Sequence, residues 1–406
     1  MNVNPIVIAI PIYFLLIAVE IFALSRKAIK SYRVNDAFAN ISCGILSQIS
    51  GAFLMVGLFN LYTWVERKFG IVDLPISWWT FILAFIMFDF MYYWAHRLSH
   101  EINLFWGGHS VHHQSEEYNL TVALRQSSTQ ILWTFLFYLP LALTGIDPFV
   151  FVISQGVNLL YQFWIHTESI KKLPKWFEFA FNTPSHHRVH HARNSAYIDK
   201  NHGGTLIIWD KIFGTFEREQ EKPIYGITKP LNSWNPFWAN FAHYVAIIKA
   251  VNLKKGLIFN LNLLFKGPGW HEKRLNIEPD LTTKFNVHLP RRVNFYLVAN
   301  FLILLLSTLY YLLVFKELLV LERVVLALLI IMNASTIGMV FDNHRHAKTI
   351  EIGRLVLIAI SLLLLWWNSV TPIMITLGAL ILASAIGWWT WSFRNTKTIR
   401  FKNELN

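Results

Sequence analysis

The chain has 406 residues, of which 54% are hydrophobic and 15% are charged. The mean hydropathy of +0.39 is too high for an ordinary soluble domain, so the composition predicts a protein of the bilayer. The basic residues behind the net charge of +12 are spread over several loops, which favours contact with anionic headgroups and argues against nucleic-acid binding. The single cysteine, Cys43, excludes a disulfide framework and a cysteine-ligated iron–sulfur cluster.

Apolar stretches that could cross a bilayer recur along the chain, since a spanning helix needs about 20 mostly apolar residues. We predict nine spans, near residues 5–25, 38–63, 76–95, 129–146, 148–165, 294–315, 318–341, 354–371 and 373–393. The first stretch lacks a basic leading segment and a small-residue cleavage site, so we expect it to be retained. The predicted fold class is therefore an all-α, polytopic integral membrane protein.

The basic residues of the short loops predict an orientation, because cytoplasmic loops carry an excess of Lys and Arg. If the basic loop at 26–33 is cytoplasmic, alternation places the loop with Arg345 and Lys348 and the basic tail from Arg394 on the same side. We therefore predict the N-terminus outside and the C-terminus inside. The sequence leaves open whether the membrane is a bacterial inner membrane or the endoplasmic reticulum.

The chain divides into three regions. Residues 1–233 are expected to form a membrane-embedded region that carries the histidine motifs, and residues 293–406 form further membrane helices and a basic tail. Between them, residues 234–292 place aromatic and aliphatic residues at helical spacing with lysines among them. This pattern fits an amphipathic helix in the headgroup zone or a short buried core helix, and the sequence leaves both open.

The histidines gather in three clusters. On a helix, residues three and four apart share a face, so each cluster directs several imidazoles to one place. The clusters are HRLSH with His96 and His100, HSVHH with His109, His112 and His113, and HHRVHH with His187, His190 and His191. The predicted topology puts all eight on the cytoplasmic side, together with His166 at the end of the fifth span.

Neutral imidazole is a common ligand for iron, zinc and copper. Nine imidazoles exceed what one ion accepts, so the motifs at 96–113 and 166–191 predict two metal ions. The alternative is that each cluster is a separate polar cap on a helix end. That alternative does not explain why three clusters fall on one face of the membrane.

Polar residues lead from these clusters into the predicted spans. They form two stripes, one with Asp89, Tyr93, His96 and His100, and one with Gln155, Asn158, Gln162 and His166. Polar residues at membrane depth are costly and face a cavity or a partner. We expect them to orient metal ligands beside a lipid channel or to bond between helices, and we expect a catalytic role for Asp89.

A dimetal site at a membrane surface could hydrolyse, transport or oxidise. The zinc-protease pattern H-E-x-x-H fails, because Ile102, Asn103 and then Leu104 follow Glu101. Transport predicts ligands deep within the spans, whereas these histidines lie at the ends. The pattern favours oxidation of a lipid substrate that enters from the bilayer, and a metal transporter or sensor is the alternative that is not an enzyme.

The strings HRLSH, HSVHH and HHRVHH resemble the eight-histidine pattern of the fatty acid hydroxylase and sterol desaturase superfamily, whose members are integral-membrane, non-haem di-iron oxygenases. This resemblance covers about residues 80 to 220. The strings QFWIHTE, NTPSHHRVHHARN, YIDKN and LIIWDKIFGTFE, with KGPGW at 266–270, are similar to the alkylglycerol monooxygenase family within it. Members of that family are tetrahydrobiopterin-dependent enzymes that cleave ether lipids.

The resemblance implies two iron ions held by the eight motif histidines, with His166 as a ninth ligand and Glu101 as a catalytic candidate. It implies that dioxygen is used to hydroxylate the carbon next to the ether bond of an alkylglycerol, which then splits into an aldehyde and a glycerol derivative. Tetrahydrobiopterin or another external electron donor would supply the electrons. Hydroxylation or desaturation of a sterol or fatty acid is the alternative within the superfamily.

One histidine departs from this resemblance. His202 stands in KNHGG at a position where an aromatic residue, typically tyrosine, is expected, and His186 lies beside the third cluster but off its shared face. The sequence leaves open whether either side chain contacts a metal. We expect the remaining histidines to be ordinary interfacial residues: His243, His271, His288, His344 and His346.

Overall fold

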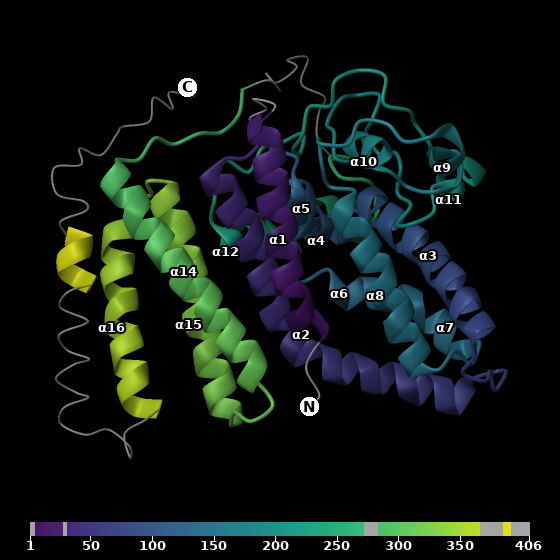
Figure 1. Ribbon diagram of the computed structural model, residues 1–406, viewed down its shortest axis with the longest axis horizontal. Coiled ribbons are helices and arrows are strands. Elements are labelled where there is room, and N and C mark those ends of the chain that lie inside the picture. Colours follow the sequence, from purple (N-terminus) through teal and green to yellow (C-terminus); the bar gives the residue numbers. More distant parts are fainter. Residues whose placement is uncertain (1–4, 27–30, 272–282, 366–384, 391–406) are drawn as a thin grey trace. The chain divides into compact units, whose positions relative to one another are not determined.

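The computed structural model describes residues 5–26, 31–271, 283–365 and 385–390, and it is built of helices (Figure 1). Within those residues the only β-structure is a pair of isolated bridges, so the predicted all-α class is confirmed. The chain forms two compact units. The histidine unit consists of Ile12–Leu231 and Ala239–Lys284, and the C-terminal unit of Met1–Pro11, Asn232–Trp238 and Phe285–Asn406.

The histidine unit contains the helices up to Phe265, with the first helix from Ile12 onward and the helix Pro236–Ala250 from Ala239 onward. They are α1 (Pro5–Arg26), α2 (Val34–Phe69), α3 (Trp78–Glu101), α4 (Asn103–His113), α5 (Leu120–Ala123), α6 (Ile131–Thr134), η1 (Phe135–Tyr138), α7 (Leu139–Leu143), α8 (Pro148–Trp164), α9 (Lys175–Ala180), α10 (Pro184–His190), α11 (Ile208–Ile212), α12 (Pro236–Ala250), η2 (Leu253–Lys255) and α13 (Gly256–Phe265). The C-terminal unit contains α14 (Arg291–Val314), α15 (Val320–Phe341) and α16 (Ala347–Leu365), with α15 packed against both neighbours.

Four helices of the described residues are long and apolar enough to cross a membrane: α2, α3, α14 and α15. The predicted span at 129–146 is instead a broken apolar segment, because a 3₁₀ turn precedes Pro140 at the start of α7. The 17 residues of α8 cover the predicted span at 148–165. Most of the predicted span at 373–393 lies outside the described residues, so the count of nine stays a prediction.

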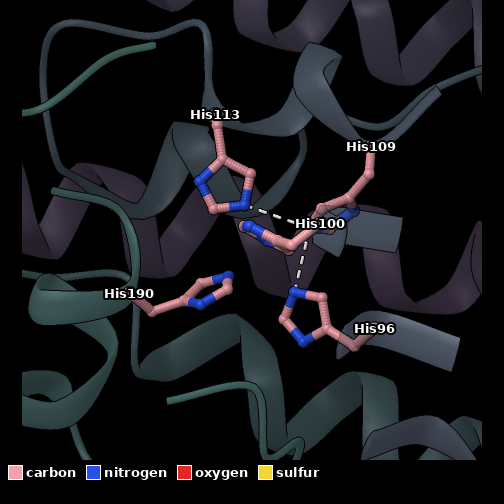
Figure 2. A group of neighbouring side chains, drawn as sticks. All are labelled: His96, His100, His109, His113 and His190. Carbon is pink, nitrogen blue, oxygen red and sulfur yellow. Dashed lines mark hydrogen bonds between the residues drawn. The ribbon is translucent and has the colours of Figure 1, made fainter. Parts of the chain in front are cut away.

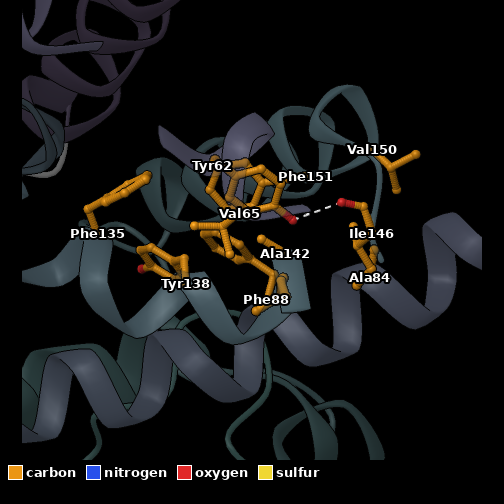
Figure 3. Packing of buried hydrophobic residues seen from close by; sticks show 11 residues of the cluster. Tyr62, Val65, Ala84, Phe88, Phe135, Tyr138, Ala142, Ile146, Val150 and Phe151 are labelled. Carbon is orange, nitrogen blue, oxygen red and sulfur yellow. Dashed lines mark hydrogen bonds between the residues drawn. The ribbon is translucent and has the colours of Figure 1, made fainter. Parts of the chain in front are cut away.

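A cluster of buried aromatic and aliphatic side chains packs around α3 (Figure 3). The Phe88 ring of α3 stacks on Tyr138 with centroids 4.6 Å apart, and Tyr62 stacks on Phe151 at 4.3 Å. The Tyr62 hydroxyl donates to the carbonyl oxygen of Ile146 at 3.0 Å. Each such ring pair contributes about 0.5–1.5 kcal/mol beyond its buried area, so the cluster fixes the helix whose last turns carry ligands.

The segment predicted to be interfacial forms α12, η2 and α13. Leu253 and Ile258 expose 86% and 77% of their surface, which does not fit a buried core helix. The segment is nevertheless tied to α4, since the amide of Asn103 donates to the carbonyl oxygen of Leu263 at 2.8 Å and its backbone N–H to that of Lys266 at 2.9 Å. These bonds fix the start of the helix that carries the second histidine cluster.

Candidate metal centre

Nine buried histidines converge in two groups. The first group is His96, His100, His109, His113 and His190, and the second is His112, His166, His187 and His191. Within each group, ring nitrogens that could bind an ion all lie within 4.8 Å of one another. Figure 2 shows the first group, whose rings surround a common centre. The structure therefore brings together the nine residues that the sequence predicted.

The spacing on α4 divides one cluster between the two groups. His109 and His113, four residues apart, face the first group, and His112 faces the second. The third cluster on α10 is divided in the same way, with His190 in the first group and the other two in the second. These two helices therefore contribute ligands to both groups, which is why the two groups are neighbours.

The Nε2 atoms approach one another at the spacing of ligands around an ion. In the first group, the Nε2 of His109 lies 2.9 Å from that of His96 and 3.0 Å from that of His113. In the second group the distances are 3.2 Å, 3.0 Å and 3.2 Å, for His112 with His166, His166 with His187, and His187 with His191. Two nitrogens that each bind one metal ion at about 2.1 Å, with about 90° between the two bonds, would lie about 3.0 Å apart.

Backbone carbonyls hold the opposite nitrogen of several rings. The Nδ1 atoms of His96, His112, His166 and His190 contact the carbonyl oxygens of His202, Arg125, Gln162 and Lys200 at 2.7, 2.9, 2.7 and 2.9 Å. A carbonyl oxygen only accepts, so each Nδ1 carries the proton and donates it. The Nε2 lone pair of each ring then faces the group, which is the arrangement found in histidine metal ligands.

Burial keeps these imidazoles in their neutral form. The nine side chains expose between 2% and 7% of their surface. Loss of hydration lowers the pKa of His112 to about 4 and that of His190 to about 3. Burial and the neighbouring His166 also hold the pKa of His187 well below its usual value. Since only neutral imidazole binds a metal, the site is prepared for ligation at neutral pH.

Asp89 lies on α3 and is fully buried. Its carboxylate accepts hydrogen bonds from the backbone N–H groups of Thr205 and Leu206 at 2.7 and 3.1 Å, and from the side chains of Asn158 and Trp209 at 2.6 and 2.9 Å. The two predicted polar stripes therefore meet at Asp89 and Asn158. This carboxylate ties α3 to α8 and to the loop that follows His202.

Asp210 also supports the site, and the sequence did not single it out. Its carboxylate accepts from the backbone N–H groups of His202 and Gly203 and from the hydroxyl of Thr215, each at 2.7 Å. The loop held in this way supplies the carbonyl oxygen that orients His96. The string IWDKIFGT, with an aspartate among apolar residues, was the signal available in the sequence.

Glu101 lies outside both histidine groups. Its side chain is 38% exposed and accepts from Arg97 at 2.8 Å, while Arg97 also donates to the Tyr93 hydroxyl at 3.2 Å. The next residue back along α3, His100, contacts the carboxylate of Asp199 through Nδ1 at 3.5 Å. A catalytic role for Glu101 stays a prediction.

The two histidines that the sequence left open differ in position. The fully buried His202 ring lies 5.0 Å from that of His100 and 5.6 Å from that of His96, measured between centroids. It borders the first group without belonging to it. His186 packs edge-on against Phe216 at 5.3 Å and belongs to neither group.

Comparison with known proteins agrees with this geometry. The fatty acid hydroxylase family model matches residues 81–215. A human alkylglycerol monooxygenase is 42% identical over 331 residues, which cover 79% of this chain and 73% of the relative. The chain belongs to the alkylglycerol monooxygenase family. Two more alkylglycerol monooxygenases, from Xenopus tropicalis and Danio rerio, are 39% and 38% identical, over 85% and 88% of this chain and 79% and 82% of their own.

Membership of the alkylglycerol monooxygenase family fixes the class of protein. It is a membrane enzyme that oxidises a lipid with oxygen, and its two histidine groups fit a di-iron centre. A more distant relative, the ornithine lipid hydroxylase OlsE of Rhizobium tropici, is 30% identical over 136 residues, covering 33% of this chain and 41% of its own. No solved structure matches the chain.

Proposed function

We propose that the protein inserts oxygen into the carbon next to the ether oxygen of an alkylglycerol. One atom of dioxygen forms the new hydroxyl group and the other leaves as water. The resulting hemiacetal falls apart into an aldehyde and a glycerol derivative. The proposal rests mainly on one observation: two neighbouring groups, one of five and one of four imidazoles, have their ring nitrogens at ligand spacing in a chain of the alkylglycerol monooxygenase family.

We assign the nine histidines to two iron ions, one in each group. When bound there, iron would supply the activation of dioxygen that attack on an unactivated carbon requires. The protein holds each imidazole neutral, directs Nε2 toward the group through the bond at Nδ1, and keeps bulk water away from the rings. Tetrahydrobiopterin is the proposed reductant.

Asp89 and Glu101 have different proposed roles. Asp89 acts as a positioning residue, because its oxygens are occupied by four donors that fix the loop beside the first group. Glu101, for which we propose a catalytic role, lies at an exposed edge, where its carboxylate accepts a hydrogen bond from Arg97.

In the proposed arrangement the long apolar helices cross the membrane, with the histidine groups at the cytoplasmic side. Residues 1–233 carry the oxygenase site, residues 234–292 lie at the interface, and residues 293–406 form the C-terminal membrane helices. The four apolar helices and the exposed Leu253 and Ile258 support this arrangement. Labelling of engineered cysteines in intact cells tests it, with Cys43 replaced by Ser.

The substrate is tested with purified, iron-loaded protein in detergent. We expect aldehyde from an alkylglycerol in the presence of oxygen and tetrahydrobiopterin, and none from the matching acylglycerol, which lacks the ether carbon. His113→Ala should form no aldehyde, whereas His346→Ala, which alters an exposed histidine, should keep the activity. Formation of a hydroxylated sterol or fatty acid without any aldehyde would instead establish the alternative within the superfamily.

A further inference from the structure

A monooxygenase consumes electrons that come from outside the protein, yet the nine imidazoles are buried. An electron path from the surface to the histidines is therefore required. A surface pocket of about 690 Å³ lies on the histidine unit, and its lining includes Tyr225 together with three lysines, one arginine and three glutamates: Lys171, Lys172, Lys222, Arg188, Glu168, Glu219 and Glu221. Its volume falls within the range of about 300–1,000 Å³ that is usual for small-molecule sites.

Stacked rings join this pocket to the second histidine group. The Tyr225 ring, part of the pocket lining, stacks on Tyr118 with centroids 4.8 Å apart and planes 15° apart. The Tyr118 ring in turn lies 5.4 Å from His191 and 5.9 Å from His166. The two tyrosines are themselves buried, so the rings form a dry, continuous contact.

Hydrogen bonds fix both tyrosines. The Tyr118 hydroxyl donates to the carbonyl oxygen of Ile165 at 3.0 Å, directly before the ligand His166. The Tyr225 hydroxyl donates to the carboxylate of Glu168 at 2.9 Å. Both rings are thus held at the ends of one short segment, and neither needs to move for contact with the second group.

We propose that the pocket binds a small planar reductant and that electrons pass through Tyr225 and Tyr118 to the second histidine group. This inference rests on the proposed function. In each turnover the reductant loses two electrons and two protons, which with dioxygen convert one C–H bond into C–OH and release one water. Both tyrosines end the cycle unchanged. The lining carries four basic residues and three glutamates, so charge alone does not select the reductant and its polar groups can bind one by hydrogen bonds.

The electron path is tested by the rate at which tetrahydrobiopterin reduces the iron of the oxidised protein without oxygen. Tyr225→Leu and Tyr118→Leu break the ring contact, and each should slow reduction about tenfold or more. Tyr225→Phe and Tyr118→Phe keep the rings and should stay within about threefold of the wild type. Unchanged rates in both leucine variants would overturn the path.

Hydrogen peroxide separates this path from the catalytic site, because peroxide supplies the oxygen atom and both electrons together. The leucine variants should form aldehyde from peroxide and an alkylglycerol at the wild-type rate. If the leucine variants lose both the peroxide reaction and reduction by tetrahydrobiopterin, the rings have a structural role, and the proposal is overturned. A wild-type protein that forms no aldehyde by either route contradicts the proposed function, while the reduction rate still tests the path.

Binding in the pocket is tested by charge reversal at its lysines. Lys171→Glu and Lys222→Glu should change the tetrahydrobiopterin concentration for half-maximal reduction about threefold or more and leave the KM for the alkylglycerol unchanged. Lys249→Glu on α12, outside the pocket lining, is the matched control. An unchanged half-maximal concentration, or reduction by a protein donor alone, would show that the pocket does not bind a small reductant.

Discussion

The two units of the protein bury polar groups in different ways. In the C-terminal unit, Arg354 donates to Glu351 at 2.6 Å and to Asn300 at 2.9 Å, and the Tyr296 hydroxyl donates to Glu351. Donors there meet acceptors, and the result is a connection between α14 and α16. In the histidine unit, by contrast, ring nitrogens converge within 4.8 Å of one another in each group, and the four rings whose Nδ1 donates to a carbonyl oxygen direct an Nε2 lone pair into the groups.

This difference separates a structural contact from a binding site. A buried ion pair satisfies its own charges, whereas converging lone pairs repel and leave polar atoms without compensation unless a cation joins them. Buried polarity alone therefore does not identify the active site. The direction of the lone pairs does, and it assigns the chemistry to the histidine unit.

The largest expected effect follows from removing a ligand. His109→Ala or His191→Ala should lower aldehyde formation by more than about 100-fold, because loss of a ligand exceeds the 10- to 100-fold cost of losing a residue that supports one. Iron content, measured on the same sample, should fall with the activity. Equal losses in His346→Ala would contradict the assignment.

A substitution in the C-terminal unit should lower the stability of the protein but leave its catalytic activity unchanged. Arg354→Met removes the cationic partner of the buried Glu351 carboxylate, which keeps the hydrogen bond from Tyr296, and we expect this to cost about 3–5 kcal/mol. Thermal unfolding in detergent measures this loss, and Glu351→Gln combined with Arg354→Met should recover part of it. Activity per folded molecule should stay unchanged. A loss as large as that of a ligand variant would remove the distinction between the units.

Acid should destabilise the iron-free histidine unit. The ordinary pKa of imidazole is 6.5, and above this pH His112 is neutral in both the folded and the unfolded chain. Burial lowers the pKa of His112 in the folded chain to about 4, so between pH 6.5 and about 4 only the unfolded chain binds the proton. Stability therefore falls as the pH drops through this window, by about 3 kcal/mol for this residue at most. Unfolding of the iron-free protein between pH 7 and 4 measures the loss, and constant stability would contradict the burial argument.

A smaller loss of activity is expected from a change at Asp89, which fixes the loop beside the first histidine group. Asp89→Asn keeps the shape but turns one acceptor into a donor that faces N–H groups, so we expect activity to fall about 10- to 100-fold. Iron should remain bound, because every ligand is still present. Complete loss of iron would assign Asp89 to the metal site instead.

Helical spacing predicted which histidines come together, but not how they divide between the two groups. The sequence indicated that His109, His112 and His113 act together because they share one helix face. It could not show that α4 contributes to two groups, since this depends on where α10 packs. Tyr118 and Tyr225 were missed for the same reason, as their contact joins residues far apart in the chain. The broken segment at 131–143 was missed because hydropathy alone does not register a 3₁₀ turn.

We propose that each of the two imidazole groups holds one iron ion. Iron analysis with Mössbauer spectroscopy on the purified protein tests it most directly, in the wild type and in His96→Ala and His166→Ala, one variant for each group. We predict about two irons per chain in the wild type, and the loss of a different iron signal in each variant. One iron or none in the folded wild type, or the same signal lost in both variants, would show that the two groups do not each hold an iron ion.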